Sequence, residues 1–339
     1  MKIAIVGFPG CGKSTCFKAI TQKTKRDIET LDPTKPHLGT VKIQDPRLYR
    51  LKELFKPEKL TQAEIIFEDL PGFHIPHIKE VEALMEVLGI FSGRAPVKDI
   101  ENMSLEFMLA DLEAINNRLP GLEKELRAKS SPREKILERD TLIKLKGILE
   151  NNMPLRGVQL TAEEEKEIRG FQFLSRKPVF ILGNIDEGHK SYDSVKAMKD
   201  FCDTKMIKCM EFCAELEAEI ADLDPSERGD FIKELGIKEA ARDAVIKLAY
   251  SALGYITFFT VKGKETKAWP VRGGITAIEA AGKIHTDIQK GFITSEVINF
   301  DDLTACGSVQ EAKKKALLRL EGKDYKIHDG DIIDFRFSK

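Results

Sequence analysis

The chain has 339 residues, of which 42% are hydrophobic and 32% are charged, and its formal net charge is -1. This length predicts two or three domains with a sizeable core, and the near-neutral charge gives no global attraction to nucleic acid or anionic lipid. No segment is long enough to span a bilayer, no signal-peptide cleavage site follows the first residues, and the six cysteines lack zinc-type spacing. We therefore expect a cytoplasmic monomer with reduced thiols, no membrane partner and no sequence-specific DNA binding.

The first predicted elements are a short buried strand over Ile3–Val6, a glycine-rich loop and an amphipathic helix. The loop GFPGCGKS fits the pattern G-x-x-x-x-G-K-[ST]. Its glycines let backbone N–H groups face phosphate oxygens, Lys13 supplies a cation, and the Ser14 hydroxyl suits Mg²⁺. A glycine turn with a chance lysine is the weaker reading, because the loop stands between a strand and a helix start that favours anions. The predicted phosphate-binding residues are Gly7, Pro9, Gly10, Cys11, Gly12, Lys13, Ser14 and Thr15.

A second phosphate and metal element is predicted in the segment AEIIFEDLPG. An apolar strand over Ile65–Glu68 ends in Asp69, and Gly72 follows three residues later. An aspartate at the carboxyl end of a strand beside the P-loop holds Mg²⁺ through a water, and the glycine offers its N–H to the γ-phosphate. We therefore predict Ser14 and Asp69 as the metal-site residues.

The residue after Gly72 bears on hydrolysis. Ras-like GTPases place a water-positioning glutamine there, whereas this chain has Phe73, which cannot orient a water by hydrogen bonding. His74 and His77 follow, and either is a candidate to approach the γ-phosphate, although exposed polar residues on a loop are the simpler reading. We expect slow intrinsic hydrolysis, with the catalytic residue unassigned.

The middle of the chain has apolar residues at helical spacing. They recur from Met108 to Leu126 and again from Ile136 to Leu149, with a turn signal at Ser130-Ser131-Pro132 between the two runs. This pattern predicts an antiparallel helical hairpin inserted within the nucleotide domain. A solvated arm and a partner-binding arm are both compatible with its mixed charges. Thr161 is predicted to cap a further helix.

The stretch GNIDEG follows the apolar run PVFIL and stands where a nucleotide-binding domain reads the base. A guanine-reading loop is normally Asn-Lys-x-Asp, in which the carboxylate accepts hydrogen bonds from guanine N1–H and the 2-amino group. Here Asn184 is in place, Ile185 replaces the lysine and Glu187 replaces the aspartate. A site that loses this geometry loses its selectivity for guanine, so we predict a preference altered towards adenine, with GTP as the alternative. Cys213 and Ala214 stand where a further loop offers backbone N–H groups to the base.

After Tyr255 the pattern changes to short alternating strands. It predicts a hairpin turning at Lys262-Gly263-Lys264, a helix in TAIEAAGKIH and a second hairpin turning at Asp329-Gly330. This order of elements is typical of a β-grasp module.

These motifs together resemble the YchF / Obg-like ATPase family, a branch of the TRAFAC P-loop GTPases. The resemblance covers most of the chain and rests on GFPGCGKST, DPRLYRLKELFKP, FEDLPG and Asn184-x-x-Glu187, with AWPVRGGITAIEAAGKIHTDIQKGFITSEVINFDDL and LEGKDYKIHDGDIIDFRF in the C-terminal third. It implies an α/β fold, a Ras-like G domain with an inserted helical hairpin and a C-terminal β-grasp TGS domain. It also implies Mg²⁺, a preference for ATP over GTP, and a ribosome or ribosomal RNA partner.

The resemblance also implies a division of the chain into four parts. The expected parts are 1–95, the first part of the G domain; 96–172, the helical coiled-coil insert; 173–253, the second part of the G domain with linking helices; and 254–339, the TGS domain.

The chain departs from the family pattern in both switch regions. The segment ETLDPTKPHLG offers Thr30 in one register and Thr34 in another as the switch I ligand of Mg²⁺. The switch II segment is short, and the region where the family carries a histidine linked to hydrolysis is compressed into LMEVLGIFSGRAP, which has none. The leading hypothesis is a slow ATPase switch, and the alternatives are a non-hydrolysing nucleotide-binding module and a GTPase. A metabolic kinase is disfavoured by the TGS-like end.

Overall fold

The structure, a computed structural model, describes residues 1–23, 32, 35–70, 72, 75–92, 95–127, 132–187, 192–224, 226–228, 230–231 and 241–338. The chain forms two compact units. The first comprises Lys2–Gly39 and Ile66–Leu248, and the second comprises Met1, Thr40–Ile65 and Ala249–Lys339. Residues 40–65, which the sequence assigns to the G domain, therefore cluster with the C-terminal residues.

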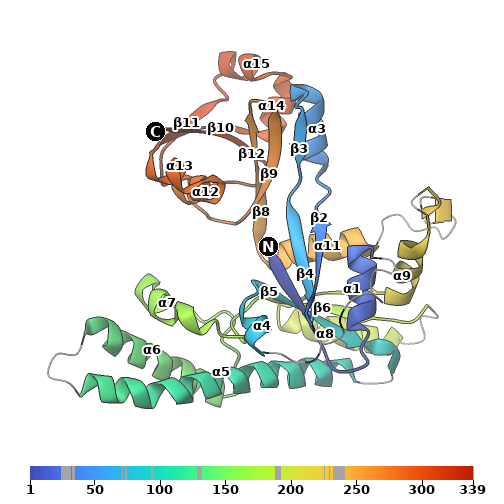
Figure 1. Ribbon diagram of the computed structural model, residues 1–339, viewed down its shortest axis with the longest axis vertical. Helices are drawn as coiled ribbons and strands as arrows, with labels where there is room; N and C mark the ends of the chain where they lie inside the picture. The colour runs from blue at the N-terminus through green and yellow to red at the C-terminus, as the bar shows by residue number, and fades with distance from the viewer. Residues whose placement is uncertain are drawn as a thin grey trace. The chain divides into compact units, whose positions relative to one another are not determined.

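The first unit is built on a six-stranded sheet in the order β2-β4-β1-β5-β6-β7 (Figure 1). β1 pairs in parallel with β4 and β5, and β5, β6 and β7 continue the parallel pairing. Every residue of β5 and β6 is buried, as expected for strands covered on both faces. Because parallel strands end at the same edge of the sheet, the loops that follow them meet there. The strands are β1 (Lys2–Val6), β2 (His37–Lys42), β4 (Glu64–Asp69), β5 (Ala83–Gly89), β6 (Val179–Asn184) and β7 (Lys208–Phe212).

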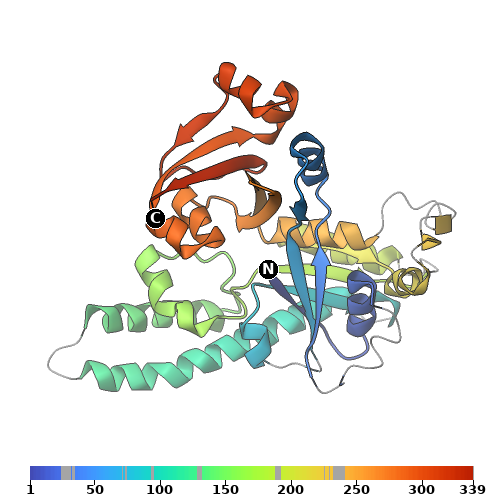
Figure 2. The same cartoon turned by 45° about the horizontal axis from the view of Figure 1, so that its top comes forward.

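The predicted helical hairpin is confirmed. α5 (Pro96–Leu126) and α6 (Arg133–Glu150) lie side by side in both views (Figures 1 and 2). Their facing residues form an apolar cluster that includes Ile115, Leu122 and Leu145, and Arg118 Nε donates to Glu138 Oε1 at 2.8 Å across the pair. The other helices described in this unit are α1 (Lys13–Thr21), α4 (Ile75–Lys79), α7 (Ala162–Ile168), α8 (Tyr192–Thr204), α9 (Ala214–Asp222) and α11 (Ala241–Ala252), which continues into the second unit.

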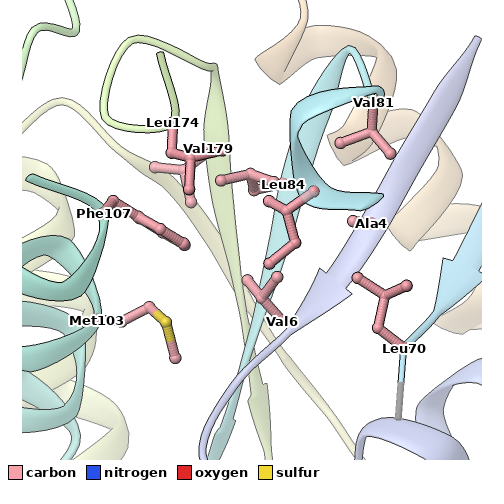
Figure 3. Close-up of a cluster of buried hydrophobic side chains, with 10 residues drawn as sticks. Ala4, Val6, Leu70, Val81, Leu84, Met103, Phe107, Leu174 and Val179 are labelled. Atoms are coloured by element: carbon pink, nitrogen blue, oxygen red, sulfur yellow. The ribbon is translucent and has the colours of Figure 1, made fainter. Parts of the chain in front are cut away.

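One apolar cluster joins the base of the hairpin to the sheet (Figure 3). Met103 and Phe107 of α5 face the side chains of β1 and β5, and Ile78 of α4 is fully buried in the same cluster. Close-packed cores resist displacement of one member without repacking the others. The short helix after Gly72 and the base of the hairpin therefore form one packed body.

Polar contacts reinforce the same junction. Asp111 of α5 is fully buried and accepts hydrogen bonds from the backbone N–H groups of Leu174 and Ser175, at 2.7 and 2.8 Å. Lys177 Nζ donates to the backbone oxygens of Lys79 and Val81, at 2.9 and 2.5 Å. These bonds connect the segment before β6 to α5 on one side and to the end of α4 on the other.

The second unit holds a six-stranded sheet in the order β11-β10-β12-β8-β9-β3. α12 and α13 contribute to the apolar cluster on one face, and α3, α14 and α15 contribute to another. The strands are β3 (Lys59–Thr61), β8 (Tyr255–Lys262), β9 (Glu265–Arg272), β10 (Phe292–Asn299), β11 (Arg319–Glu321) and β12 (Asp331–Phe337). The helices are α3 (Pro46–Phe55), α12 (Ala277–Ile284), α13 (Thr286–Lys290), α14 (Phe300–Cys306) and α15 (Val309–Lys314).

The hairpin predicted at Lys262-Gly263-Lys264 is confirmed as β8 and β9, but the one predicted at Asp329-Gly330 is wrong. β12 pairs with β10 and β8, and Lys326 before the turn makes only a single bridge to Thr276. Asp329 Oδ1 accepts the Thr257 N–H at 2.8 Å, and the Gly330 N–H donates to the Thr257 oxygen at 2.8 Å. This turn is therefore bonded to β8 and does not fold a local hairpin.

Two further findings concern the cysteines and the length of the helices. The six cysteines are all free thiols. Among the described residues, no helix is both long and apolar enough to cross a bilayer.

Glu86 of β5 is a buried carboxyl whose ionisation opposes folding. It is 3% exposed, and its Oε1 has no hydrogen-bond partner among the described residues. Burial raises its pKa to about 8, against the nearby charge of Arg156 and with a smaller contribution from Asp99.

We predict that Glu86→Gln removes part of the pH dependence of stability. Between the ordinary glutamate pKa and about 8, the carboxyl is protonated in the folded chain and ionised in the unfolded chain. The wild-type free energy of unfolding therefore falls as pH rises, by at most about 1.4 kcal/mol per pH unit from this group. Urea unfolding from pH 5 to 9 should show a shallower decline for Glu86→Gln, with exposed Glu101→Gln as the control. Parallel curves for Glu86→Gln and wild type would contradict this account.

Candidate nucleotide-binding site

The glycine-rich loop joins β1 to α1 at the carboxyl edge of the first sheet. Gly12 is the N-cap of α1 with φ 91°, and a Cβ there would lie 2.2 Å from Asn184 Nδ2. Gly7, at the start of the loop, has no room either, because a Cβ would lie 2.5 Å from the Val87 oxygen. A side chain at either position would force the loop away from its neighbours. The glycines of the motif are thus required by close approach as well as by backbone conformation.

Lys13 is the first residue of α1, and its side chain turns back over the loop. Nζ donates to the Gly7 oxygen at 2.8 Å and to the Phe8 oxygen at 3.3 Å. A bound phosphate would exchange such a contact for a stronger, charge-assisted hydrogen bond. Ser14 and Thr15 are exposed in the same first turn, whereas Cys11 is buried beneath the loop.

The metal side of the site is formed by Asp69 at the end of β4. The carboxyl is 4% exposed, and burial raises its pKa, while a hydrogen bond from Ser14 and the charges of His37 and Lys13 lower it. Its Oδ1 is buried without a hydrogen-bond partner among the described residues, which is the state expected of a carboxylate oxygen that awaits a cation or its water. Mg²⁺ fits this donor set, because it keeps several waters and takes few protein ligands.

Within the described ranges, no group of three or more His, Cys, Asp or Glu side chains is placed to hold a metal ion by itself.

His37 belongs to the site, although the sequence pattern did not single it out. β2 begins at His37 and β4 ends at Asp69. Just after β2 and just before β4, the Ile43 N–H donates to the Ala63 oxygen at 2.8 Å. Counted along both strands from this bond, His37 stands opposite Asp69, and the two side chains interact electrostatically. The alternating residues of 37–42 predict a strand, but they do not say which segment pairs with it. The place of His37 beside Asp69 becomes visible only when the two strands are paired.

The base-reading side is organised by Asn184, the last residue of β6. Its Nδ2 donates to the Cys11 oxygen in the P-loop at 3.1 Å, and its Oδ1 accepts the Ala214 N–H at 3.1 Å. The side chain is buried, at 5% exposure. Asn184 therefore joins the P-loop to the N-terminus of α9. Cys213 is the N-cap of that helix, and burial raises the pKa of its thiol.

The residues after Asn184 differ in exposure. Ile185 is buried, at 7% exposure, and its N–H donates to the Phe212 oxygen at 3.0 Å. Glu187 is exposed. Asp186 Oδ1 is buried with no hydrogen-bond partner among the described residues. The Ile185 side chain thus packs into the protein, and the carboxyl groups of Asp186 and Glu187 belong to the loop that follows.

Phe91 is a second neighbour of the P-loop that the sequence analysis missed. It follows β5, and its side chain is 44% exposed. Its ring lies 3.9 Å from the position of a Cβ on Gly12 and 3.5 Å from that of a Cβ on Gly89. An aromatic residue just after the carboxyl end of a buried parallel strand was the available signal.

The structure thus brings the predicted P-loop residues, Asp69, Asn184 and Ala214 to one edge of the sheet. Gly72 is exposed with φ 81°, and His77 is exposed on α4. Four predicted site residues lie outside the described residues: Thr30, Thr34, Phe73 and His74; so do Ser130 and Ser131 of the predicted turn.

Comparisons with known proteins match both ends of the chain. A family model described as 50S ribosome-binding GTPase matches residues 2–128. The model YchF-GTPase_C, described as a protein of unknown function (DUF933), matches residues 255–338.

Curated relatives match over nearly the full length. The "Ribosome-binding ATPase YchF" of Bacillus subtilis (strain 168) is 35% identical over 364 residues, with 98% of each chain covered. The protein of the same name from Escherichia coli O157:H7 is 35% identical with 99% of each covered. The one from Mycoplasma genitalium is 34% identical, covering 100% of this chain and 99% of its own.

A solved structure has the same fold. The YchF GTPase of Schizosaccharomyces pombe superposes with a TM-score of 0.79 at 24% identity, over 99% of this chain and 97% of that chain.

We predict that Asn184→Ala destabilises the protein. The change leaves the Cys11 oxygen and the Ala214 N–H buried without their partner, at a cost of about 1–3 kcal/mol each. Urea unfolding should show the loss. The control is Asn151→Ala, because Asn151 is exposed and its side chain donates to the Gly147 oxygen on the surface of the helix end. An Asn184→Ala midpoint equal to that of the control would show that the bridge adds nothing.

Proposed function

The chain belongs to the YchF family, and from this membership and the site geometry we propose that it is a Mg²⁺-dependent nucleotide hydrolase that prefers ATP to GTP and acts as a switch on a ribosomal or RNA partner. One observation carries the proposal: the P-loop, Asp69 and Asn184 converge at one sheet edge, where Asn184 bonds the P-loop to Ala214 and Ser14 bonds Asp69. The curated relatives are named ribosome-binding ATPases.

The phosphate chemistry follows from the residues in place. Lys13 and the backbone N–H groups of the loop bind the β- and γ-phosphates, and Ser14 with Asp69 holds Mg²⁺ directly or through water. Mg²⁺, when bound, neutralises charge on the phosphate oxygens. Gly72 is exposed with a positive φ and offers its N–H to the γ-phosphate. The P-loop residues thus bind the phosphates, Asp69 serves the metal, and Gly72 contacts the γ-phosphate.

The preference for ATP rests on the loop after β6. The amide nitrogen and the amide oxygen of Asn184 are both hydrogen-bonded to the protein, so this side chain positions the loop. Ile185 is buried and supplies no cation above the P-loop. Glu187 is exposed and one methylene longer than the aspartate that accepts two hydrogen bonds from guanine. A base site without that pair of bonds loses the discrimination that favours guanine.

Ribosome association is proposed from the relatives' names and from the form of the chain. The helical hairpin extends from the nucleotide unit (Figure 1), and the second unit has the β-grasp architecture. Either supplies a surface outside the nucleotide site. The second candidate function, a nucleotide-binding module without turnover, is favoured by one observation: Phe73 stands where a water-positioning glutamine is found in Ras-like enzymes.

We predict that Lys13→Ala weakens nucleotide binding by about 10- to 100-fold, the loss of a hydrogen bond to a charged group. Titration calorimetry with ATP and GTP, each with and without Mg²⁺, should give tighter binding for ATP and a dependence on Mg²⁺. Lys18→Ala is the matched control, because Lys18 lies on the same helix and pairs with Asp222.

Each other result has a clear meaning. Tighter GTP binding would make the protein a GTPase. Binding of neither nucleotide would remove the proposed function. A phosphate-release rate that Lys13→Ala leaves unchanged would favour the module without turnover.

We also predict nucleotide-dependent binding to ribosomes. Sedimentation through a sucrose cushion should recover more protein with ribosomes in a non-hydrolysable ATP analogue than in ADP, because a switch binds its partner in one nucleotide state. Equal recovery in both states, or none in either, would contradict the switch.

A further inference from the structure

His37 lies at the metal edge of the site. Directly opposed side chains of an antiparallel pair have Cβ atoms about 4.5–5.5 Å apart and point to the same face, which places His37 next to Asp69. The imidazole packs against Phe17 of α1, with ring centroids 6.5 Å apart and an interplanar angle of 41°. The ring therefore adjoins both the strand that ends in the metal-side carboxylate and the helix that carries the P-loop lysine.

The hydrogen bonds of the ring define which nitrogen is available. Nε2 of His37 lies 2.8 Å from the Asp32 oxygen. A carbonyl oxygen only accepts, so Nε2 carries the proton and donates. In the neutral ring, Nδ1 is then an acceptor. Because Nδ1 is bonded to Cγ, it lies nearer to the backbone of β2 than Nε2 does.

Electrostatics agree with this placement. The carboxyl of Asp69 accepts a hydrogen bond from Ser14, and it lies close enough to His37 and Lys13 for both side chains to act on its pKa. The same carboxylate thus has the P-loop and the imidazole as neighbours. Ser14 and Asp69 are the residues that would hold Mg²⁺ next to the phosphates, so His37 is a neighbour of the metal side of the proposed site.

Hydrolysis requires a side chain that orients the attacking water beside the γ-phosphate. Phosphoryl-transfer enzymes orient the attacking water with a hydrogen-bond acceptor, and Phe73 supplies none. We propose that His37 is a catalytic residue of the hydrolysis inferred above, and that its Nδ1 accepts a hydrogen bond from the water that attacks the γ-phosphorus. This inference depends on the proposed function and names the group that it left unassigned.

The step balances without a further reactant. The water oxygen forms a bond to the γ-phosphorus, and the bond from phosphorus to the β–γ bridging oxygen breaks, leaving its electron pair on ADP. One water proton passes to a γ-phosphate oxygen, so that ATP⁴⁻ and H₂O give ADP³⁻ and H₂PO₄⁻. His37 orients the water and keeps its own proton on Nε2.

Two substitutions separate this role from a structural one. His37→Gln places an amide nitrogen near the position of Nε2, so it keeps the bond to the Asp32 oxygen and loses the acceptor near the strand. His37→Asn places an amide oxygen near the position of Nδ1 and does not reach Asp32. The catalytic role predicts that Gln is the damaging change, whereas a structural role predicts that Asn is. His77→Gln, on exposed α4, tests the other described histidine that the sequence offers as a candidate, and His285→Gln, at an exposed residue of the second unit, is the control.

The experiment measures phosphate release, affinity for Mg·ADP, and retention of ADP with aluminium fluoride, which mimics the transferring phosphoryl group. We expect His37→Gln to lower kcat by about 10²-fold, to bind Mg·ADP within about threefold of wild type, a change of less than 1 kcal/mol, and to lose the aluminium fluoride complex. His37→Asn should keep at least about a tenth of the wild-type kcat.

Three outcomes would overturn the assignment: a wild-type kcat in His37→Gln, greater damage from Asn than from Gln, or loss of the aluminium fluoride complex in His77→Gln with His37→Gln unaffected. Failure of the wild-type protein to bind or hydrolyse nucleotide would instead reject the proposed function. A wild-type protein that hydrolyses ATP, with His37→Gln equally active, rejects this inference alone.

Discussion

The site depends on one side-chain amide. Asn184 donates to the Cys11 oxygen of the P-loop and accepts the N–H of Ala214, and both bonds are buried. The P-loop comes close enough for this only because Gly12 has no side chain, since a Cβ there would meet Asn184 Nδ2 at 2.2 Å. The proposed phosphate-binding and base-reading loops are far apart in the sequence, and these two bonds hold them together. Loss of the amide would leave both loops with unsatisfied buried groups.

A second constraint acts below the site. The base of the helical hairpin and α4 share one apolar cluster with the strands (Figure 3), and Lys177 bonds the end of α4. Arg156 Nε, in the segment after α6, donates to the Lys177 oxygen at 3.0 Å. α4, which begins three residues after Gly72, and the hairpin therefore rest on the same core. Interiors of this density move as bodies and do not deform continuously.

The sequence predicted those parts whose signals are local. The P-loop, the two long helices and the β8–β9 hairpin depend on residues close together in the chain, and each formed where its pattern stands. The prediction at Asp329-Gly330 was wrong because the turn residues are bonded to Thr257 of β8, a partner that no local pattern reveals. The placement of 40–65 with the C-terminal residues depends likewise on distant contacts, such as β3 on β9.

The candidate site divides in the same way. Lys13, Asp69 and Asn184 could be predicted, because the spacing of their motifs and their positions after predicted strands are visible in the sequence. His37 is not, because its position opposite Asp69 follows from a strand register, and Phe91 reaches the P-loop only in three dimensions. The lone buried oxygens of Asp69 and Asp186 also become visible only when the neighbours of each atom are known.

The central claim is that phosphate and base recognition form one site joined through Asn184. Amide hydrogen exchange with and without Mg·ATP tests it most directly. The account predicts that ATP protects residues 7–16 and residues 212–218 together in the wild-type protein, and that Asn184→Ala uncouples the two, leaving protection at 7–16 alone. Protection confined to 7–16 in the wild type would contradict the account, because the base-side loop would then be no part of the site.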